Sequence, residues 1–141
     1  MVIALLVVAV TGFASMPLFA QGDDDEPQDA VAIFNEAQDL HEKGDLMGAI
    51  KLYDKAIALA EDFPEAQYQK GSAYLALNKL DDAEASFRKA IIKRPEWSLA
   101  LAMLGDALVR KQIAAVESAN SAEAQRLSIE AAGTLGKAIE L

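Results

Sequence analysis

A 34-residue unit, Pro64–Trp97, constrains the fold more than any other feature, because its apolar pattern recurs along the chain. Within the unit, small and large residues stand at set positions: Gly71, Tyr74, Ala83, Phe87 and Ala90. The positions 34 residues earlier hold residues of similar kinds: Ala37, Leu40, Ala49, Tyr53 and Ala56. The positions 34 residues after Gly71 and Tyr74 hold Gly105 and Leu108. A fixed period of this length indicates an array of helical repeats.

Apolar residues at helical spacing divide this region into short helices joined by short turns. The spacing predicts helices over residues 29–43, 46–60, 65–77 and 81–93, and a fifth that begins at Pro95. Gly44 and Asn78 end the first and third of these helices, and Pro64 stands in a first turn, where its missing N–H is tolerated. Aromatic residues make up only 6% of the chain, which agrees with an all-α fold. Helices so close in sequence are antiparallel neighbours.

The third repeat is longer than the other two. Its small–large–small pattern falls at Ala131, Leu135 and Ala138, fourteen residues beyond the place that the period gives. Fourteen residues are close to four helical turns, so about seven extra residues on each helix keep both apolar faces in register. Asn120 followed by Glu123 is typical of a helix N-terminus. We therefore expect the last hairpin to consist of two lengthened helices.

Residues 1–20 carry no charge and resemble an export signal, whereas every charged residue lies after them. An apolar run followed by small residues is typical of a signal peptide, with cleavage expected after Ala20 or, alternatively, after Ala14. A run of roughly twenty apolar residues also just spans a bilayer, so an uncleaved membrane anchor is the second interpretation. Residues 21–28, QGDDDEPQ, are expected to form an acidic linker. The protein is accordingly expected to be exported and to be periplasmic, secreted or anchored to the membrane by residues 1–20.

Charge and composition narrow the function classes. The net charge of −9 repels nucleic acids and anionic lipids, so no nucleic-acid partner is expected and any membrane contact would run through residues 1–20. With no cysteine and one histidine, the chain lacks the usual zinc ligand sets, and no metal or cofactor is expected. His41 has no nucleophile or paired carboxylate at catalytic spacing, and no hydrolase or nucleotide-binding motif is present. We therefore do not expect an enzyme.

The landmarks of the middle unit resemble the consensus of the tetratricopeptide repeat (TPR) family: Gly71, Tyr74, Ala83, Phe87, Ala90 and Pro95. The resemblance covers residues 29–141 as three repeats, at about 30–63, 64–97 and 98–141. It departs at Gln67 and Lys70, where the family has Trp and Leu, so looser packing is expected at that end of the helix. The resemblance implies a right-handed α-solenoid with a concave face.

The repeat pattern also assigns packing roles. Ala37, Gly71 and Gly105 lie where the two helices of a unit meet, and only a small side chain permits their close approach. Tyr53 and Phe87 are the large residues expected to fill the space between units. Small residues complete the buried stripe of the second helices: Ala49, Ala56, Ala83 and Ala90.

The resemblance places a binding groove along the first helix of each unit. The helical phase puts the following residues on it: Phe34, Gln38, His41, Tyr68, Gln69, Ser72, Leu75, Leu99, Ala102, Met103 and Asp106. One branch of the family grips a peptide's C-terminal carboxylate with lysine, arginine and asparagine residues on this face. The matching positions here hold apolar or amide residues, so that clamp is absent and the groove suits an apolar or helical segment of a partner.

The sequence therefore predicts a non-enzymatic scaffold that binds a protein or peptide partner. A structural, self-associating repeat protein is the first alternative, because the last helix would expose an apolar face. A second copy, forming a homodimer through that helix, or further repeats of a longer protein would cover this face. A membrane-anchored assembly factor is the third interpretation, if residues 1–20 are retained.

Overall fold

The computed structural model describes residues 29–141, which form six α-helices and no β-strand. The helices are α1 (Ala30–Glu42), α2 (Leu46–Leu59), α3 (Pro64–Ala76), α4 (Leu80–Lys93), α5 (Ser98–Glu117) and α6 (Ser121–Glu140). The predicted export segment and acidic linker, residues 1–28, lie outside this part of the chain. Among the described residues, no helix is long and apolar enough to cross a bilayer. The prediction of an all-α repeat array is confirmed.

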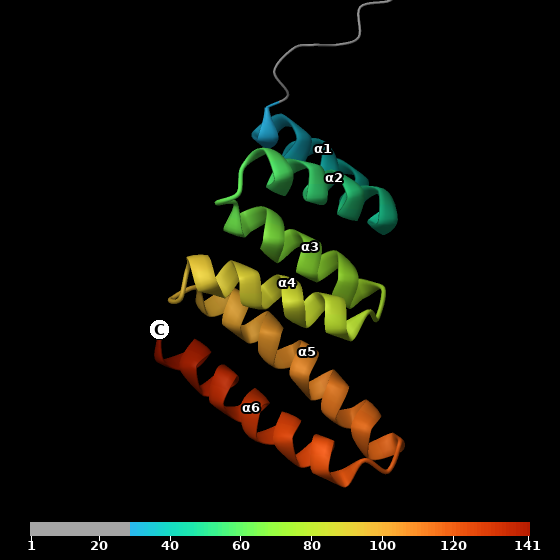
Figure 1. Ribbon diagram of the computed structural model, residues 1–141, viewed down its shortest axis with the longest axis vertical. Coiled ribbons are helices and arrows are strands. Elements are labelled where there is room, and N and C mark those ends of the chain that lie inside the picture. The colour runs from blue at the N-terminus through green and yellow to red at the C-terminus, as the bar shows by residue number, and fades with distance from the viewer. Residues whose placement is uncertain (1–28) are drawn as a thin grey trace, which may run out of the picture.

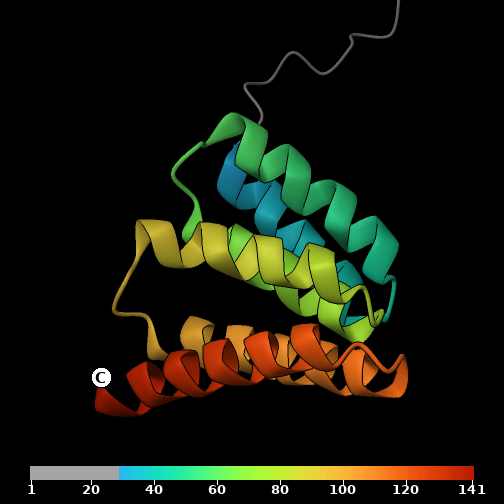
Figure 2. The ribbon, with the colours of Figure 1, turned by 60° about the horizontal axis from the view of Figure 1, so that its bottom comes forward.

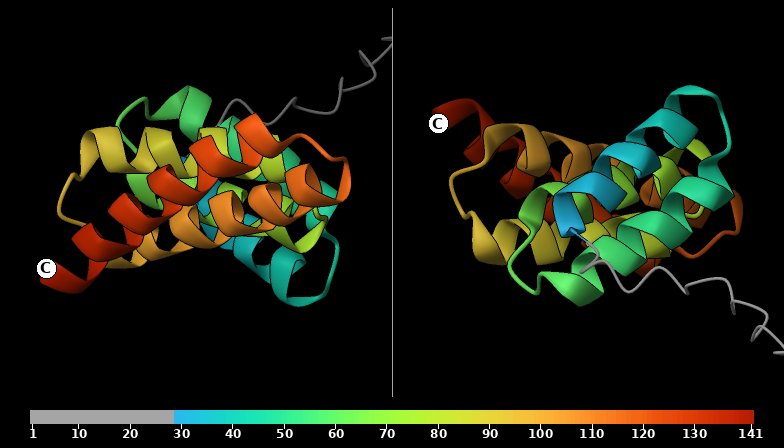
Figure 3. Two further views of the ribbon diagram at one scale, coloured as in Figure 1. Left: turned by 90° about the horizontal axis from the view of Figure 1, so that it is seen from below. Right: turned by 90° about the horizontal axis from the view of Figure 1, so that it is seen from above.

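The six helices pair into three antiparallel hairpins that stack one on the next (Figure 1). The first helices, α1, α3 and α5, lie in one row, and the second helices, α2, α4 and α6, lie in another (Figure 2). Viewed along the stack, the first and last hairpins cross each other, because each repeat is rotated relative to its neighbour (Figure 3). Backbone contacts join α1 to α3 and α3 to α5, whereas none join α2 to α4 or α4 to α6. The array therefore curves toward the first helices, whose row forms its concave side.

Within each hairpin a small residue of the first helix faces a large residue of the second. A Cβ atom placed on Gly71 would lie 2.8 Å from Phe87 Cε1, and one placed on Gly105 would lie 2.4 Å from Leu135 Cδ2. Ala37 belongs with Tyr53 to the corresponding core cluster of the first repeat. The residues predicted to pack the second helices are fully buried: Ala49, Tyr53, Ala56, Ala83, Phe87 and Ala90. These residues are thus buried as expected, but the two large ones differ from the prediction that both fill the space between units. Phe87 contacts Gly71 of its own hairpin and also belongs to a core cluster with Leu104 of the third repeat, whereas the core cluster of Tyr53 consists of first-repeat residues.

The predicted start of the fifth helix at Pro95 is wrong, because α5 begins at Ser98. Residues 94–97 form a turn in which the Trp97 N–H donates to the Arg94 carbonyl at 3.2 Å. This turn lets the Trp97 ring lie 4.8 Å, centroid to centroid, from the Tyr68 ring of α3. The Arg94 guanidinium covers the same indole at 4.5 Å from its centroid. Trp97, the residue just before α5, is therefore held against α3 by this aromatic contact.

The lengthened hairpin is confirmed. Helices α5 and α6 each have 20 residues, whereas α3 has 13 and α4 has 14. The predicted cap is also present, because Asn120 Oδ1 accepts a hydrogen bond from the Glu123 backbone N–H at 3.2 Å. The pairing of Gly105 with Leu135 shows that the extra residues leave the small–large contact in register.

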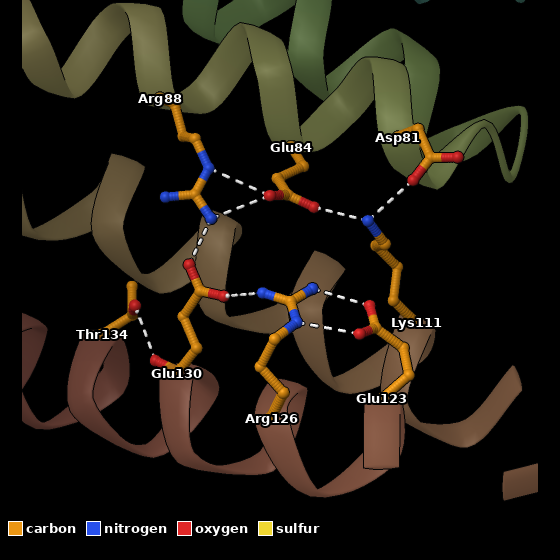
Figure 4. A network of polar contacts seen from close by, with 8 residues as sticks. All are labelled: Asp81, Glu84, Arg88, Lys111, Glu123, Arg126, Glu130 and Thr134. Carbon is orange, nitrogen blue, oxygen red and sulfur yellow. Dashed lines mark hydrogen bonds and ion pairs between the residues drawn. The ribbon is translucent and has the colours of Figure 1, made fainter. Parts of the chain in front are cut away.

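A chain of ion pairs fastens this hairpin to α4 (Figure 4). The pairs, in order along the chain, are Asp81–Lys111 at 2.7 Å, Lys111–Glu84 at 2.7 Å, Glu84–Arg88 at 2.8 Å, Arg88–Glu130, Glu130–Arg126 at 3.0 Å and Arg126–Glu123 at 2.6 Å. Burial alone would raise the pKa of Glu84, but hydrogen bonds from Lys111 and Arg88 outweigh it and hold that pKa below its ordinary value. Partly exposed ion pairs contribute about 0.2–1 kcal/mol each to the free energy of unfolding. This network of ion pairs therefore orients the hairpin more than it stabilises the fold.

We expect Gly71→Leu to lower the free energy of unfolding by about 1–3 kcal/mol, because the new side chain would overlap the buried Phe87 ring. Ala85→Leu is the matched control, since Ala85 lies exposed on α4 and its replacement should change stability by less than about 0.5 kcal/mol. Chemical denaturation followed by circular dichroism measures both. Equal stabilities of the two variants would contradict the assigned contact.

Candidate functional site

A shallow pocket opens on the concave side between the first two repeats. Its volume is about 230 Å³, and it is lined by Gln38, His41, Glu42, Tyr53 and Gln69. The first three residues share one face of the last turns of α1, because residues three and four positions apart lie on one side of a helix. Gln69 comes from α3 and Tyr53 from α2, so the pocket exists only where two repeats meet. We call this feature the concave pocket.

The concave pocket holds a histidine–tyrosine contact. His41 Nδ1 and the Tyr53 hydroxyl lie 3.4 Å apart, and the two rings meet edge to face with centroids 6.2 Å apart. Tyr53 is fully buried, so its hydroxyl needs a polar neighbour and His41 supplies one. Burial raises the pKa of Tyr53 to about 12, and the negative charge of Glu42 adds to this effect. The phenol therefore stays neutral and can donate a hydrogen bond at physiological pH.

Aromatic side chains pack beside the concave pocket in the first two repeats. Phe34 lies 5.7 Å from Tyr53 and 4.9 Å from Phe63, centroid to centroid. The Tyr68 ring lies 5.8 Å from Phe87 and 4.8 Å from Trp97, again between ring centroids. Phe34 and Tyr68, both predicted groove residues, are half-buried, so only part of each side chain is open to a ligand.

The other predicted groove residues divide into several environments. Leu75 is buried in the core and cannot line the groove, because stacking of α5 against α3 covers it. Met103 is half-buried and packs against the same core cluster. Leu99 is 51% exposed, but it lines a separate hollow together with residues of α6. Of the predicted groove residues, Gln38, His41 and Gln69 therefore line the concave pocket, whereas Leu99 and Ala102 line the separate hollow beside α6.

Ser72, Ala102 and Asp106 are half-buried on the same helices. The Ser72 hydroxyl donates to the Tyr68 carbonyl at 3.2 Å, which satisfies it within its own helix. Asp106 accepts a hydrogen bond from Arg110 Nε at 3.1 Å, so its charge is matched by a neighbour on α5. These residues contribute shape rather than free hydrogen-bonding groups to the concave side.

The concave pocket carries one formal charge, the carboxylate of Glu42, beside two amides and a neutral phenol. None of the residues that line it is a lysine or an arginine. The described residues also contain no group of three histidine, cysteine, aspartate or glutamate side chains that could hold a metal ion. The arrangement is suited to donating and accepting hydrogen bonds beside aromatic surface.

Two residues of the concave pocket were not predicted as groove residues, namely Tyr53 and Glu42. Tyr53 was assigned to packing alone. A signal was present in the sequence, because the corresponding residue of the second repeat is Phe87, which has no hydroxyl. A hydroxyl at a buried repeat position requires a polar partner.

We expect the raised pKa of Tyr53 to make stability depend on pH in a defined window. The folded state favours the neutral phenol, so this stabilisation is fully present below about pH 10, the unfolded tyrosine pKa. It is lost as the pH rises from there to about 12, the pKa of Tyr53 in the folded state. Denaturation at several pH values should show this loss in the parent and not in Tyr53→Phe. An identical pH dependence in the two proteins would contradict it, and Tyr74→Phe serves as the control.

Solved structures of other proteins show the same fold. The crystal structure of MamA matches with a TM-score of 0.66 and 24% identity over 79% of this chain and 57% of that one. The second TPR of Spaghetti (RPAP3), bound to the HSP90 peptide SRMEEVD, matches with a TM-score of 0.55 and 22% identity over 74% and 90% of the two chains. The TPR2B domain of yeast Sti1, in complex with pHsp70, matches with a TM-score of 0.58 and 21% identity over 79% of this chain and 96% of that one. The match thus spans little more than half of MamA.

No curated protein matches the sequence. The family model described as tetratricopeptide repeat matches residues 34–97 and, in an overlapping match, residues 68–132. Together the two matches extend over well more than half of the chain and include the contact of Gly71 with Phe87. This family generally consists of non-enzymatic modules that mediate protein–protein interaction. The stacked hairpins, the small–large contacts and the family match together show that the chain belongs to the tetratricopeptide repeat family.

Proposed function

We propose that the protein is a non-enzymatic adaptor that holds a peptide or helical segment of a partner protein against its concave side. The concave pocket carries this proposal, because residues of two repeats bring two half-buried amides and a histidine together there, beside the buried hydroxyl of Tyr53. The Gln38 and Gln69 amides can donate and accept hydrogen bonds along the backbone of an extended segment. Phe34 and Tyr68, both half-buried on the same helices, add aromatic surface near these amides.

The charge of the concave side indicates the chemistry of the partner. The HSP90 peptide found on the RPAP3 domain contains two glutamates and an aspartate. Such a peptide needs cations, yet the concave pocket has none and contains Glu42. We infer a partner segment that is uncharged or basic where it enters this pocket.

In the same proposal the protein acts outside the cytosol, in the periplasm or as a secreted protein. The support is the uncharged run of residues 1–20 followed by the acidic residues 21–28. The alternative is a membrane-anchored assembly factor that keeps residues 1–20.

We expect the double variant Gln38→Ala/Gln69→Ala to lose a partner that the parent captures when each full chain is crosslinked in an envelope extract of the source organism. Both amides line the concave pocket, and neither residue belongs to a core cluster, so we expect both truncations to leave the helix packing intact. The matched control is Lys55→Gln/Lys89→Gln, at equivalent exposed positions of α2 and α4. A labelled SRMEEVD peptide should show no saturable binding. Capture that survives in the groove variant, or tight binding of SRMEEVD, would overturn the proposed mode.

We expect the mature protein isolated from cells to begin at Gln21, or at Ser15 if cleavage follows Ala14. Mass spectrometry of the intact chain and of its N-terminal peptide measures this directly. A mature chain that still carries residues 1–20 and fractionates with membranes would replace the exported adaptor by the anchored one.

A further inference from the structure

The outer side of α6 carries a stripe of five apolar residues and one glutamine, and the described part of the chain leaves all of them exposed except Gly136, which is half-buried. Its residues recur at alternating steps of three and four: Ala122, Gln125, Ile129, Ala132, Gly136 and Ile139. Ile129 is 70% exposed and Ile139 is 85% exposed, and the opposite side of α6 is buried through Ala124, Leu127 and Ala131. In the first two repeats the second helix is covered by the next hairpin, as α3 covers α2 and α5 covers α4. We call these six residues the outer stripe.

The spacing of the outer stripe indicates what kind of element covers it. Apolar positions separated by alternating steps of three and four are the a and d positions of a coiled-coil seam. Such a seam is matched by another helix lying nearly parallel or antiparallel to it.

Two glycines of α6 fit close approach by such a helix. A Cβ atom at Gly133 or Gly136 would meet nothing within 4 Å in this chain, whereas one at Gly71 or Gly105 would collide with a neighbour. Glycine inside a helix costs about 0.5–1 kcal/mol relative to alanine, and the fold of one chain gives no reason for it here.

The charges beside the outer stripe point to a second copy of this chain. Arg126 and Glu140 stand on the same edge of the stripe, seven residues before and seven residues after Gly133. In an antiparallel pair of α6 helices, Arg126 of each copy therefore meets Glu140 of the other. In a parallel pair the two groups lie at opposite ends, about 21 Å apart. Charge complementarity thus selects both the occupant and its direction.

We propose that two copies of the protein associate through an antiparallel pair of α6 helices. In this register Ile129 of each copy packs against Ile139 of the other, Ala132 packs against Gly136, and two Arg126–Glu140 ion pairs flank the seam. The concave pocket is lined by α1, α2 and α3, and α6 contacts none of these helices, so pairing through α6 leaves the pocket open. A dimer presents two such pockets and would hold a partner with two binding segments by avidity.

Disulfide trapping tests the pairing and its direction, because the chain contains no cysteine. We expect full-length Ile129→Cys mixed with Ile139→Cys to give, on mild oxidation, a disulfide between the two different variants. Ala85→Cys, exposed on α4, mixed with Ile139→Cys is the control and should give none. Links mainly between like variants would indicate a parallel pair and overturn the proposal. If the mixture gives no more disulfides than the control, two α6 helices do not pair with each other, and the proposal is overturned as well.

Charge reversal provides an independent readout. We expect Arg126→Glu alone and Glu140→Arg alone to weaken dimerisation by about tenfold in sedimentation measurements. In a dimer of either variant, both symmetric contacts between residues 126 and 140 would join side chains of the same charge. An equimolar mixture of the two variants should recover the parent's affinity, because the mixed dimer restores opposite charges. Arg126 also bonds Glu123 and Glu130 within its own chain, and the mixture separates that contribution from the contact between copies. A parent that stays monomeric over the measured concentrations, or a mixture that shows no recovery, would overturn the proposal.

Discussion

The structure depends on one repeated contact, in which a small residue of the first helix of a hairpin faces a large residue of the second. Gly71 with Phe87 and Gly105 with Leu135 show it most clearly, because no Cβ atom fits at either glycine. The contact sets how closely the two helices approach, and a constant approach is what allows successive hairpins to stack as a regular array. Its steric demand explains why the period of 34 residues is visible in the sequence at all.

The same contact also builds the candidate site. Tyr53 occupies in the first repeat the place of Phe87 in the second, and its extra hydroxyl reaches the concave pocket beside His41. Because the ring is fixed by packing, the hydroxyl is held in position before any ligand arrives. Phe87 instead packs on Tyr68 and leaves no polar group there. Both rings pack in the core, but the hydroxyl oxygen of Tyr53 also contributes a polar atom to the concave pocket, and Phe87 has no such atom.

Local pattern predicted most of the fold, and contacts between repeats account for what it missed. Helical spacing, the cap at Asn120 and the lengthened hairpin follow from neighbouring residues, so the sequence shows them directly. The burial of Leu75 and the start of α5 at Ser98 depend on how one hairpin lies against the next. For the site, the helical phase placed Gln38, His41 and Gln69 on one side, and they line the concave pocket, but it could not show that Tyr53 and Glu42 line it as well. Helical periodicity predicts on which side of a helix a residue lies, whereas the residues that line a pocket also depend on how far apart the helices are.

The insertion in the third repeat changes more than its length. Because about seven residues were added to each helix, the contact of Gly105 with Leu135 stayed in register while the hairpin gained new surface. That surface supplies Lys111 to the ion-pair chain that joins the hairpin to α4. The outer stripe runs over 18 residues, Ala122–Ile139, which is about 27 Å of helix. A helix as short as α4, with 14 residues, could not carry all six stripe positions. Lengthening therefore converts the last repeat from a unit that only packs on its neighbour into one with a seam of its own.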